Sequence, residues 1–202
     1  MNWWRGTWCV LRRELASYFE SPVAYVFIII FLALCGFFTF MVSRFFELGE
    51  ASLRPFFFWH PWLYLILVPA VGMRLWAEER RSGSMELLLT LPIAAWQAIV
   101  GKFLAAWAFL ALALLLTFPV VLTVIYLGDP DEGTIFTGYL GSFLVAGIYL
   151  AVSTMTSAFT RSQVVSFIVS VVFCLLLVLA GWPPVTDIFS QWAPHWMVDR
   201  KS

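Results

Sequence analysis

The run "VAYVFIIIFLALCGFFTFMVS", residues Val23–Ser43, decides the fold class of this chain. It holds 21 consecutive residues without a charge. At about 1.5 Å of rise per residue, a helix of this length crosses the roughly 30 Å hydrocarbon core of a bilayer. Ser21 and Pro22 stand before it, and these residue types favour the N-cap and the first position of a helix. The run therefore predicts a membrane-spanning helix over residues 23–43.

The composition of the whole chain agrees with a membrane protein. Of its 202 residues, 62% are hydrophobic and 12% are charged, and the mean hydropathy is +0.89. A soluble domain carries about twice that share of charge, because most of its surface meets water. The formal net charge is zero, so the composition gives no indication of a nucleic acid partner. We expect an all-α polytopic membrane protein.

Three further runs lack charges and predict spans over residues 103–127, 134–160 and 164–181. A fifth segment, residues 55–77, has a shorter apolar core that Pro69 interrupts. We predict that it is a kinked span, since proline is tolerated in membrane helices whose neighbours satisfy the freed carbonyl groups. The alternative is a re-entrant or interfacial segment. The sequence thus predicts about five transmembrane helices within residues 23–181.

The distribution of charge predicts the orientation of these spans. Basic residues concentrate on the cytoplasmic side of membrane proteins. With five spans and a cytoplasmic N-terminus, eight of the twelve basic residues lie inside, namely Arg5, Arg12, Arg13, Arg74, Arg80, Arg81, Lys102 and Arg161. Residues 182–202, which are rich in tryptophan and proline, are then expected to be an extracytoplasmic interfacial tail.

Residues 1–22 have the pattern of an amphipathic helix. Trp4, Trp8 and Leu11 recur at helical spacing, and charged side chains occupy the opposite face. Such helices lie in the membrane interface with tryptophan at headgroup depth. We predict that Trp4, Trp8, Leu11, Arg12 and Arg13 bind membrane lipid there.

The connection between the second and third spans, residues 78–102, contains the densest charge cluster and then a leucine run. Glu78 and Glu79 mark the end of the span, and Gly83 is expected to break the helix. Residues 85–91 predict a two-turn helix, and Pro92 is expected to start the next one. A helix this short is not stable alone, so its leucines need either the membrane interface or a groove on a cytoplasmic partner.

Small residues follow one face of the fourth span. Gly138, Ser142 and Ala146 recur at four-residue steps, and small side chains let membrane helices approach closely. This stripe predicts helix packing, either within the chain or across a dimer.

The spans offer little reactive chemistry. The four charge-free spans also lack histidine, which disfavours an ion-coupled carrier or an intramembrane hydrolase. His60 and His195 are expected at the surface or the interface, and no metal site is predicted because no ligand cluster surrounds them. Gly101-Lys102 is not a phosphate-binding loop, since Trp96 and Phe103 replace the required glycine and hydroxyl residue.

Two stretches resemble a known family. "LRRELASYFESPVAYV" (Leu11–Val26) leads into the first span, and "EERRSGSMELLLTLPIAAWQAIVGKF" (Glu78–Phe103) joins the second and third spans. Together they are similar to the permease subunits of ABC-2 type ABC transporters, particularly the small gliding-motility and copper-processing permeases of bacteria. Such permeases usually have six spans, whereas this sequence predicts about five.

The resemblance implies a function and partners. The connection of residues 78–102 would form a coupling helix that docks on a separate ATPase subunit. ATP and magnesium would bind to that subunit, and this chain would be no enzyme and hold no cofactor. Coupling residues would be Glu78, Glu79, Gly83, Glu86, Leu87 and Leu88. A second permease copy or a paired permease would complete the complex in the bacterial inner membrane, for export or related work. The charge-free spans also permit a membrane anchor that recruits an ATPase without translocating a substrate.

Overall fold

The computed structural model describes residues 3–43, 53–83, 94–128 and 130–182. In these ranges the chain forms helices and no strand, which confirms the all-α prediction. Five segments are long and apolar enough to cross a membrane: Pro22–Val42, Arg54–Arg81, Ala95–Leu127, Glu132–Phe159 and Gln163–Ala180. The protein is therefore a multi-pass membrane protein.

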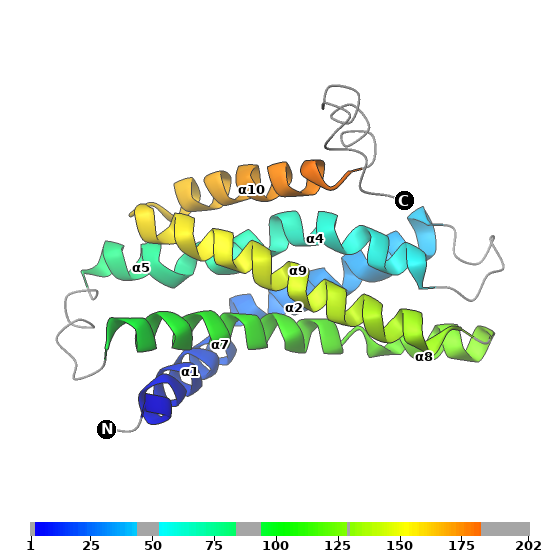
Figure 1. The fold of residues 1–202 in the computed structure, drawn as a ribbon, viewed down its shortest axis with the longest axis horizontal. Coiled ribbons are helices and arrows are strands. Elements are labelled where there is room, and N and C mark those ends of the chain that lie inside the picture. The colour runs from blue at the N-terminus through cyan, green and yellow to red at the C-terminus, as the bar shows by residue number, and fades with distance from the viewer. Residues whose placement is uncertain (1–2, 44–52, 84–93, 129, 183–202) are drawn as a thin grey trace, which may run out of the picture.

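Most of these segments consist of more than one helical element. The element bounds are α1 Trp3–Glu20, α2 Pro22–Phe37, the π-helical turn η1 Phe38–Val42, α4 Arg54–Gly72, α5 Arg74–Ser82, α7 Ala95–Leu115, α8 Phe118–Leu127, α9 Glu132–Phe159 and α10 Gln163–Ala180. The long helices run along the bundle, and α1 crosses it at an angle beside α7 (Figure 1). The bundle has an α5 end, where α5 stops and α7 starts, and an α8 end.

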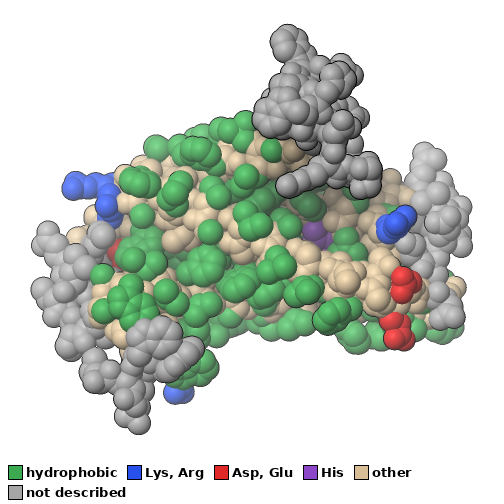
Figure 2. All heavy atoms as spheres, in the orientation of Figure 1, with side chains coloured by type: hydrophobic (Ala, Val, Ile, Leu, Met, Phe, Trp, Pro, Cys, Tyr) green, Lys and Arg blue, Asp and Glu red, His purple; other side chains and the backbone are tan. Residues whose placement is uncertain are grey.

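Figure 2 shows apolar side chains over the middle of the visible face and charged side chains toward both ends of the bundle. Many large apolar side chains on the outside of the bundle are exposed, including Ile29, Leu115 and Phe136. Exposed apolar side chains are costly in water but fit a bilayer. The exposed band between two charged ends is the arrangement of a membrane-spanning bundle.

The first span begins where the sequence predicted. Ser21 is the N-cap of α2, Pro22 occupies the first turn, and the Val23 N–H donates a hydrogen bond to the Ser21 hydroxyl at 3.4 Å. This cap satisfies one of the amide groups that a helix start leaves without an intrahelical partner. The turn between α1 and α2 is thus set by local chemistry.

The second span consists of two helices, α4, which ends at Gly72, and α5, which starts at Arg74. Pro69 lies inside α4, and its carbonyl oxygen accepts a hydrogen bond from the Met73 N–H at 2.9 Å, so the kink predicted at Pro69 stays a prediction. α5 then continues to Ser82, and Gly83 ends it with a φ of +73°. Glycine adopts this left-handed conformation without the steric cost of a side chain, so the predicted helix break at Gly83 is confirmed.

The third span has a helical start and a break in its middle. α7 begins at Ala95 and continues to Leu115, which agrees with the predicted helix that leads into the span; Pro92 itself lies outside the described residues. The helix breaks between Leu115 and Phe118, just before Pro119. At this break the Thr117 hydroxyl donates to the Leu114 carbonyl at 2.6 Å and lies 2.8 Å from the Tyr139 hydroxyl.

The expectation that His60 lies at the surface is wrong. Its side chain is 1% exposed inside α4, and Nδ1 lies 2.8 Å from the Phe56 carbonyl oxygen. The rings of Phe56 and Tyr64 pack edge-on against it, with centroids at 4.4 and 5.4 Å. Sequence reasoning placed His60 at a span end, but α4 begins at Arg54 and carries it further inside.

The small-residue stripe packs within the chain. A side chain at Gly138 would overlap the ring of Phe57, and the Ser142 hydroxyl lies 2.8 Å from the Tyr64 hydroxyl. Ala146 is buried in the core. Of the two roles predicted for this stripe, the structure supports the close packing of α9 against α4.

Candidate functional site

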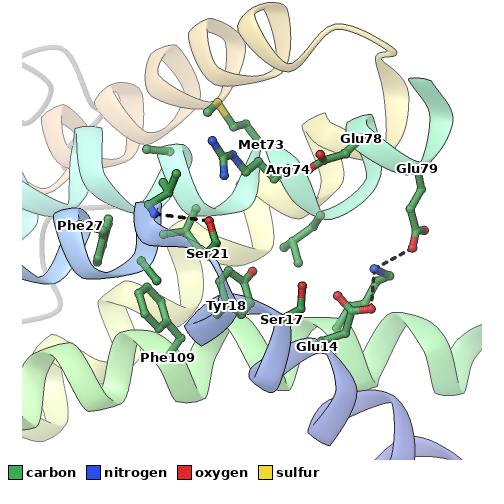
Figure 3. A pocket seen from close by; sticks show the side chains of 16 residues that line it. Glu14, Ser17, Tyr18, Ser21, Phe27, Met73, Arg74, Glu78, Glu79 and Phe109 are labelled. Carbon is green, nitrogen blue, oxygen red and sulfur yellow. Dashed lines mark hydrogen bonds and ion pairs between the residues drawn. The ribbon is translucent and has the colours of Figure 1, made fainter. Parts of the chain in front are cut away.

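Three helices meet at the α5 end through one buried lysine. Lys102 of α7 is 3% exposed, and its Nζ lies 2.9 Å from Glu79 Oε1 of α5 and 3.1 Å from Glu14 Oε1 of α1. Arg13 adds a second cation, 2.8 Å from the same Glu14 oxygen. We call these four residues the Lys102 cluster. Figure 3 shows Glu14 and Glu79, with dashed lines for the ion pairs that Lys102 forms with them. The cluster connects elements that are far apart in the sequence.

Small residues bring α1 and α7 close enough to form this cluster. A Cβ at Gly101 would lie 2.9 Å from Val10 Cβ and 3.1 Å from the Thr7 carbonyl oxygen, closer than side chains tolerate. A Cβ at Gly6 would lie 3.0 Å from the Gln97 side-chain oxygen. The same Gln97 oxygen accepts a hydrogen bond from the Ala94 N–H at 3.1 Å, which caps the start of α7. The glycine before Lys102 therefore serves helix packing.

The electrostatics of the cluster favour the charged form of Glu14. Burial alone would raise the pKa of Glu14, but the hydrogen bond from Arg13 and the charge of Lys102 outweigh it, so its pKa lies below the ordinary value. The hydrogen bond to Glu14 raises the pKa of Arg13 against the effect of its partial burial. Lys102 also lies over the ring of Trp76, 5.7 Å from its centroid, within range of a cation–π attraction.

A serine of α9 holds the start of α5. The Ser157 hydroxyl donates to the Met73 carbonyl oxygen at 3.0 Å and accepts from the N–H groups of Trp76 and Ala77, at 3.1 and 3.0 Å. These backbone groups lie at the break between α4 and α5, where the helix cannot satisfy all of them. A hydroxyl offers one donor and two acceptor positions, so Ser157 uses all three here. The break is thereby fastened to α9.

A cavity of about 430 Å³ lies beside the Lys102 cluster. α1, the start of α2, the α4–α5 break and α7 surround it (Figure 3). Figure 3 shows Glu14, Glu78 and Glu79 on one side of it and the aromatic residues Tyr18, Phe27 and Phe109 on the other. Arg74 and Lys102 also line it. Over the described ranges, no group of three His, Cys, Asp or Glu side chains is arranged to hold a metal ion.

The structure places the predicted coupling residues in three ways. Glu79 belongs to the Lys102 cluster, Glu78 lines the neighbouring cavity, and Gly83 ends α5. Glu86, Leu87 and Leu88 lie outside the described residues. The segment that holds them follows directly on α5 and precedes α7.

The predicted interface residues lie on α1. Trp4 is within the helix, Trp8 is 65% exposed, and Arg12 and Arg13 are exposed as well. Leu11 is half-buried. α1 also has a protein-facing side at Thr7 and Val10, which pack on α7; the sequence pattern did not reveal it.

Sequence reasoning missed the roles of Glu14, Lys102 and Ser157. Each is a polar residue near an apolar run. For Lys102 the sequence did contain a signal, because a lysine two turns into a membrane helix needs a countercharge. Its partners could not be identified, because Glu14 and Glu79 are 88 and 23 residues away along the chain.

Comparison with known proteins identifies the bundle. The family model described as "ABC-2 family transporter protein" matches residues 55–193, which span α4 to α10 and continue past the described region. No curated protein sequence matches the chain. The narrower resemblance to gliding-motility and copper-processing permeases stays a prediction.

Proposed function

Because the chain belongs to the ABC-2 transporter family, we propose that it is a permease subunit that couples ATP hydrolysis by a separate ATPase to export or related transmembrane work. The Lys102 cluster is the observation that carries this proposal. Glu79 lies one turn before the end of α5, and Lys102 lies two turns into α7. Residues 84–94 connect these two helices, so a force on that segment reaches both of them.

The cluster provides a route from the coupling segment into the bundle. The Lys102–Glu79 contact joins α5 to α7, Lys102–Glu14 adds α1, and Ser157 fastens α5 to α9. Buried and packed helices move as units instead of deforming continuously. A displacement of residues 84–94 would therefore move α1, α5, α7 and α9 together.

In this proposal the α5 end faces the cytoplasm. Arg12 and Arg13 on α1, Arg80 and Arg81 on α5, and Arg161 in the turn between α9 and α10 lie toward this end (Figure 1). Asp131 and Glu132 lie at the α8 end. This charge distribution agrees with the excess of basic residues on the cytoplasmic side of membrane proteins. The N-terminus would then be cytoplasmic, in the inner membrane of a bacterium.

The chain itself is proposed to carry no catalytic activity. ATP and magnesium would bind to the partner ATPase, and the permease would receive the motion through residues 84–91. A second permease copy or a paired permease would complete the translocation path. The partner groove would take Leu87 and Leu88, as a groove takes the apolar face of a short helix.

Co-purification tests the docking of the ATPase. The permease is co-expressed with its ATPase and isolated through a tag on the ATPase. We expect the Leu87→Asp/Leu88→Asp variant to be lost from the complex, because two carboxylates cannot be buried unpaired in an apolar groove. Ser84→Asp/Thr90→Asp, which adds the same charge to the same segment, is the matched control. A complex that survives the leucine changes contradicts the docking proposal.

The orientation is tested separately with an impermeant thiol reagent. Met85→Cys provides the target, in a background in which the exposed Cys9 is changed to serine. Labelling is expected in inverted membrane vesicles and absent in intact cells. Labelling of intact cells would place the coupling segment on the outer side and overturn the proposal.

A further inference from the structure

We propose that the cavity beside the Lys102 cluster binds the headgroup of an aminophospholipid, of the phosphatidylethanolamine type. The phosphate would lie at Arg74 and the ammonium group at the carboxylates of Glu14 and Glu78. This proposal does not rest on ATPase docking, since the residues that line the cavity belong to α1, α2, α4, α5, α7 and the turns between them, outside the proposed docking segment 84–91.

The cavity lies at the depth of lipid headgroups. The first span starts at its edge, because Ser21, the N-cap of α2, is one of its lining residues. Val23, which also lines it, is 48% exposed, and Tyr25 and Val26 on the same helix are each 52% exposed. Headgroups end and acyl chains begin at the start of an apolar span. A lipid could therefore hold its headgroup in the cavity and extend its chains along α2.

The two sides of the cavity match the two parts of a lipid. Its volume of about 430 Å³ accommodates a headgroup and the start of the acyl chains. The aromatic side, with Phe27 and Phe109, continues toward the membrane interior from the charged side. An amphiphile satisfies both surfaces at once, whereas a free ion would leave the aromatic side without an apolar partner.

In this proposal the guanidinium group of Arg74 binds the lipid phosphate. The Arg74 side chain lines the cavity together with Ser21, the N-cap of α2, and none of the ion pairs found among the described residues includes it. Lys102 differs, since its Nζ already lies between Glu79 and Glu14. Guanidinium binds phosphate through paired hydrogen bonds, so Arg74 has both the position and the donors.

The carboxylates select the rest of the headgroup. The lining has three acids, Glu14, Glu78 and Glu79, and two bases, Arg74 and Lys102, and Arg13 adds a third base beside Glu14, so the formal charge is zero. A zwitterionic headgroup keeps this balance, whereas an anionic headgroup adds a negative charge beside the carboxylates. A primary ammonium has three N–H donors, and a carboxylate accepts several hydrogen bonds at once. Phosphatidylethanolamine thus fits better than phosphatidylglycerol, which has no cation, or phosphatidylcholine, which has no N–H.

Native mass spectrometry of the intact chain, released from detergent micelles, tests the proposal. The probes are dioleoyl phosphatidylethanolamine, phosphatidylcholine and phosphatidylglycerol, each added in equal amounts, with inorganic phosphate as the free anion. We expect phosphatidylethanolamine to bind about tenfold or more tightly than the other two lipids, because they lose charge-assisted hydrogen bonds. Equal retention of the three lipids, or displacement of the lipid by phosphate, would overturn the proposal.

Variants locate the binding site. Arg74→Gln is expected to weaken phosphatidylethanolamine binding about tenfold or more, and Arg74→Lys to restore part of it. Arg161→Gln, an exposed arginine outside the cavity, is the matched control. If Arg74→Gln does not fold, Ser17→Trp tests the same binding site. The indole fills the cavity and leaves Arg74 in place, so this variant is expected to lose phosphatidylethanolamine binding. Binding that is unchanged in Ser17→Trp, or equal in Arg74→Gln and Arg161→Gln, contradicts the assignment.

Discussion

Replacing Lys102 with methionine should destabilise the bundle strongly. Methionine has nearly the same length and retains the packing of the lysine stem, so the change removes mainly the charge. The Glu14 and Glu79 side chains are each 17% exposed. Both carboxylates would therefore lose their shared cation in a site where water replaces it poorly.

The geometry indicates the size of the effect. At about 3 Å and an effective dielectric constant of about 20, each contact of Lys102 amounts to roughly 5 kcal/mol of gross attraction. The free energy of removing the charges from water offsets most of that attraction. When one partner of a buried pair is removed, the other charge stays desolvated without the attraction, which typically destabilises a protein by about 3–5 kcal/mol. Arg13 cannot compensate, because its side chain is 57% exposed, and exposed pairs contribute about 0–1 kcal/mol.

The free energy of unfolding can be measured by titrating the purified chain with sodium dodecyl sulfate in mixed micelles and recording helix content. We expect Lys102→Met to lose about 3 kcal/mol or more. The triple variant Lys102→Met/Glu14→Gln/Glu79→Gln should recover most of that loss, because no buried charge is then left without a partner. Arg161→Gln, at an exposed position, should stay within about 0.5 kcal/mol of the parent.

Two results would refute this reasoning. One is a Lys102→Met variant as stable as Arg161→Gln, which would mean that the contacts contribute nothing. The other is a triple variant as unstable as the single one. The loss would then come from packing and not from unpaired carboxylates.

Three further predictions concern α1, α7 and α9. The pKa of folded Glu14 lies below the ordinary 4.5, so its ionised form stabilises the fold above that pH, and this stabilisation is lost as the pH falls through the folded pKa. Lowering the pH should therefore reduce the free energy of unfolding of Glu14→Gln by less than that of the parent. In the same unfolding titration, Gly101→Ala should lower the free energy of unfolding by about 1–3 kcal/mol, because the added methyl group clashes with α1. Gly36→Ala is the control: a Cβ there has nothing within 4 Å, so the change should be neutral or stabilising by up to about 1 kcal/mol. Ser142→Ala should cost about 0.6 kcal/mol, up to about 2, through the lost Tyr64 hydrogen bond, and a Tyr64→Phe/Ser142→Ala double variant should show that the two losses are not additive.

Local sequence patterns were sufficient to predict the helices and some of their ends. The cap at Ser21 and the helix end at Gly83 each depend on backbone chemistry within a few residues. Such interactions act at short range, so the residue type and its neighbours predict them. The boundaries of α7 were harder, because Ala95–Phe103 is apolar enough to belong either to the span or to its connection.

The candidate site needed long-range information. Nothing near Lys102 in the sequence indicates that its countercharges come from Glu14 and Glu79. The burial of His60 could not be predicted either, because it depends on how Phe56 and Tyr64 pack around it. The small residues of α9 were compatible with packing within the chain or across a dimer, and only the structure showed that Phe57 and Tyr64 of α4 lie against Gly138 and Ser142.

The sequence by itself determined that this chain is a bundle of about five membrane-spanning helices with an amphipathic N-terminal helix. Hydrophobic length and end caps are properties of consecutive residues, and the bilayer requires each apolar run to satisfy its own backbone hydrogen bonds. Only the tertiary structure decided which helices touch. The Lys102 cluster and its cavity depend on close approach at Gly101 and on charges from three separate helices, and helix pairing in a membrane is set by side-chain packing that no single helix encodes.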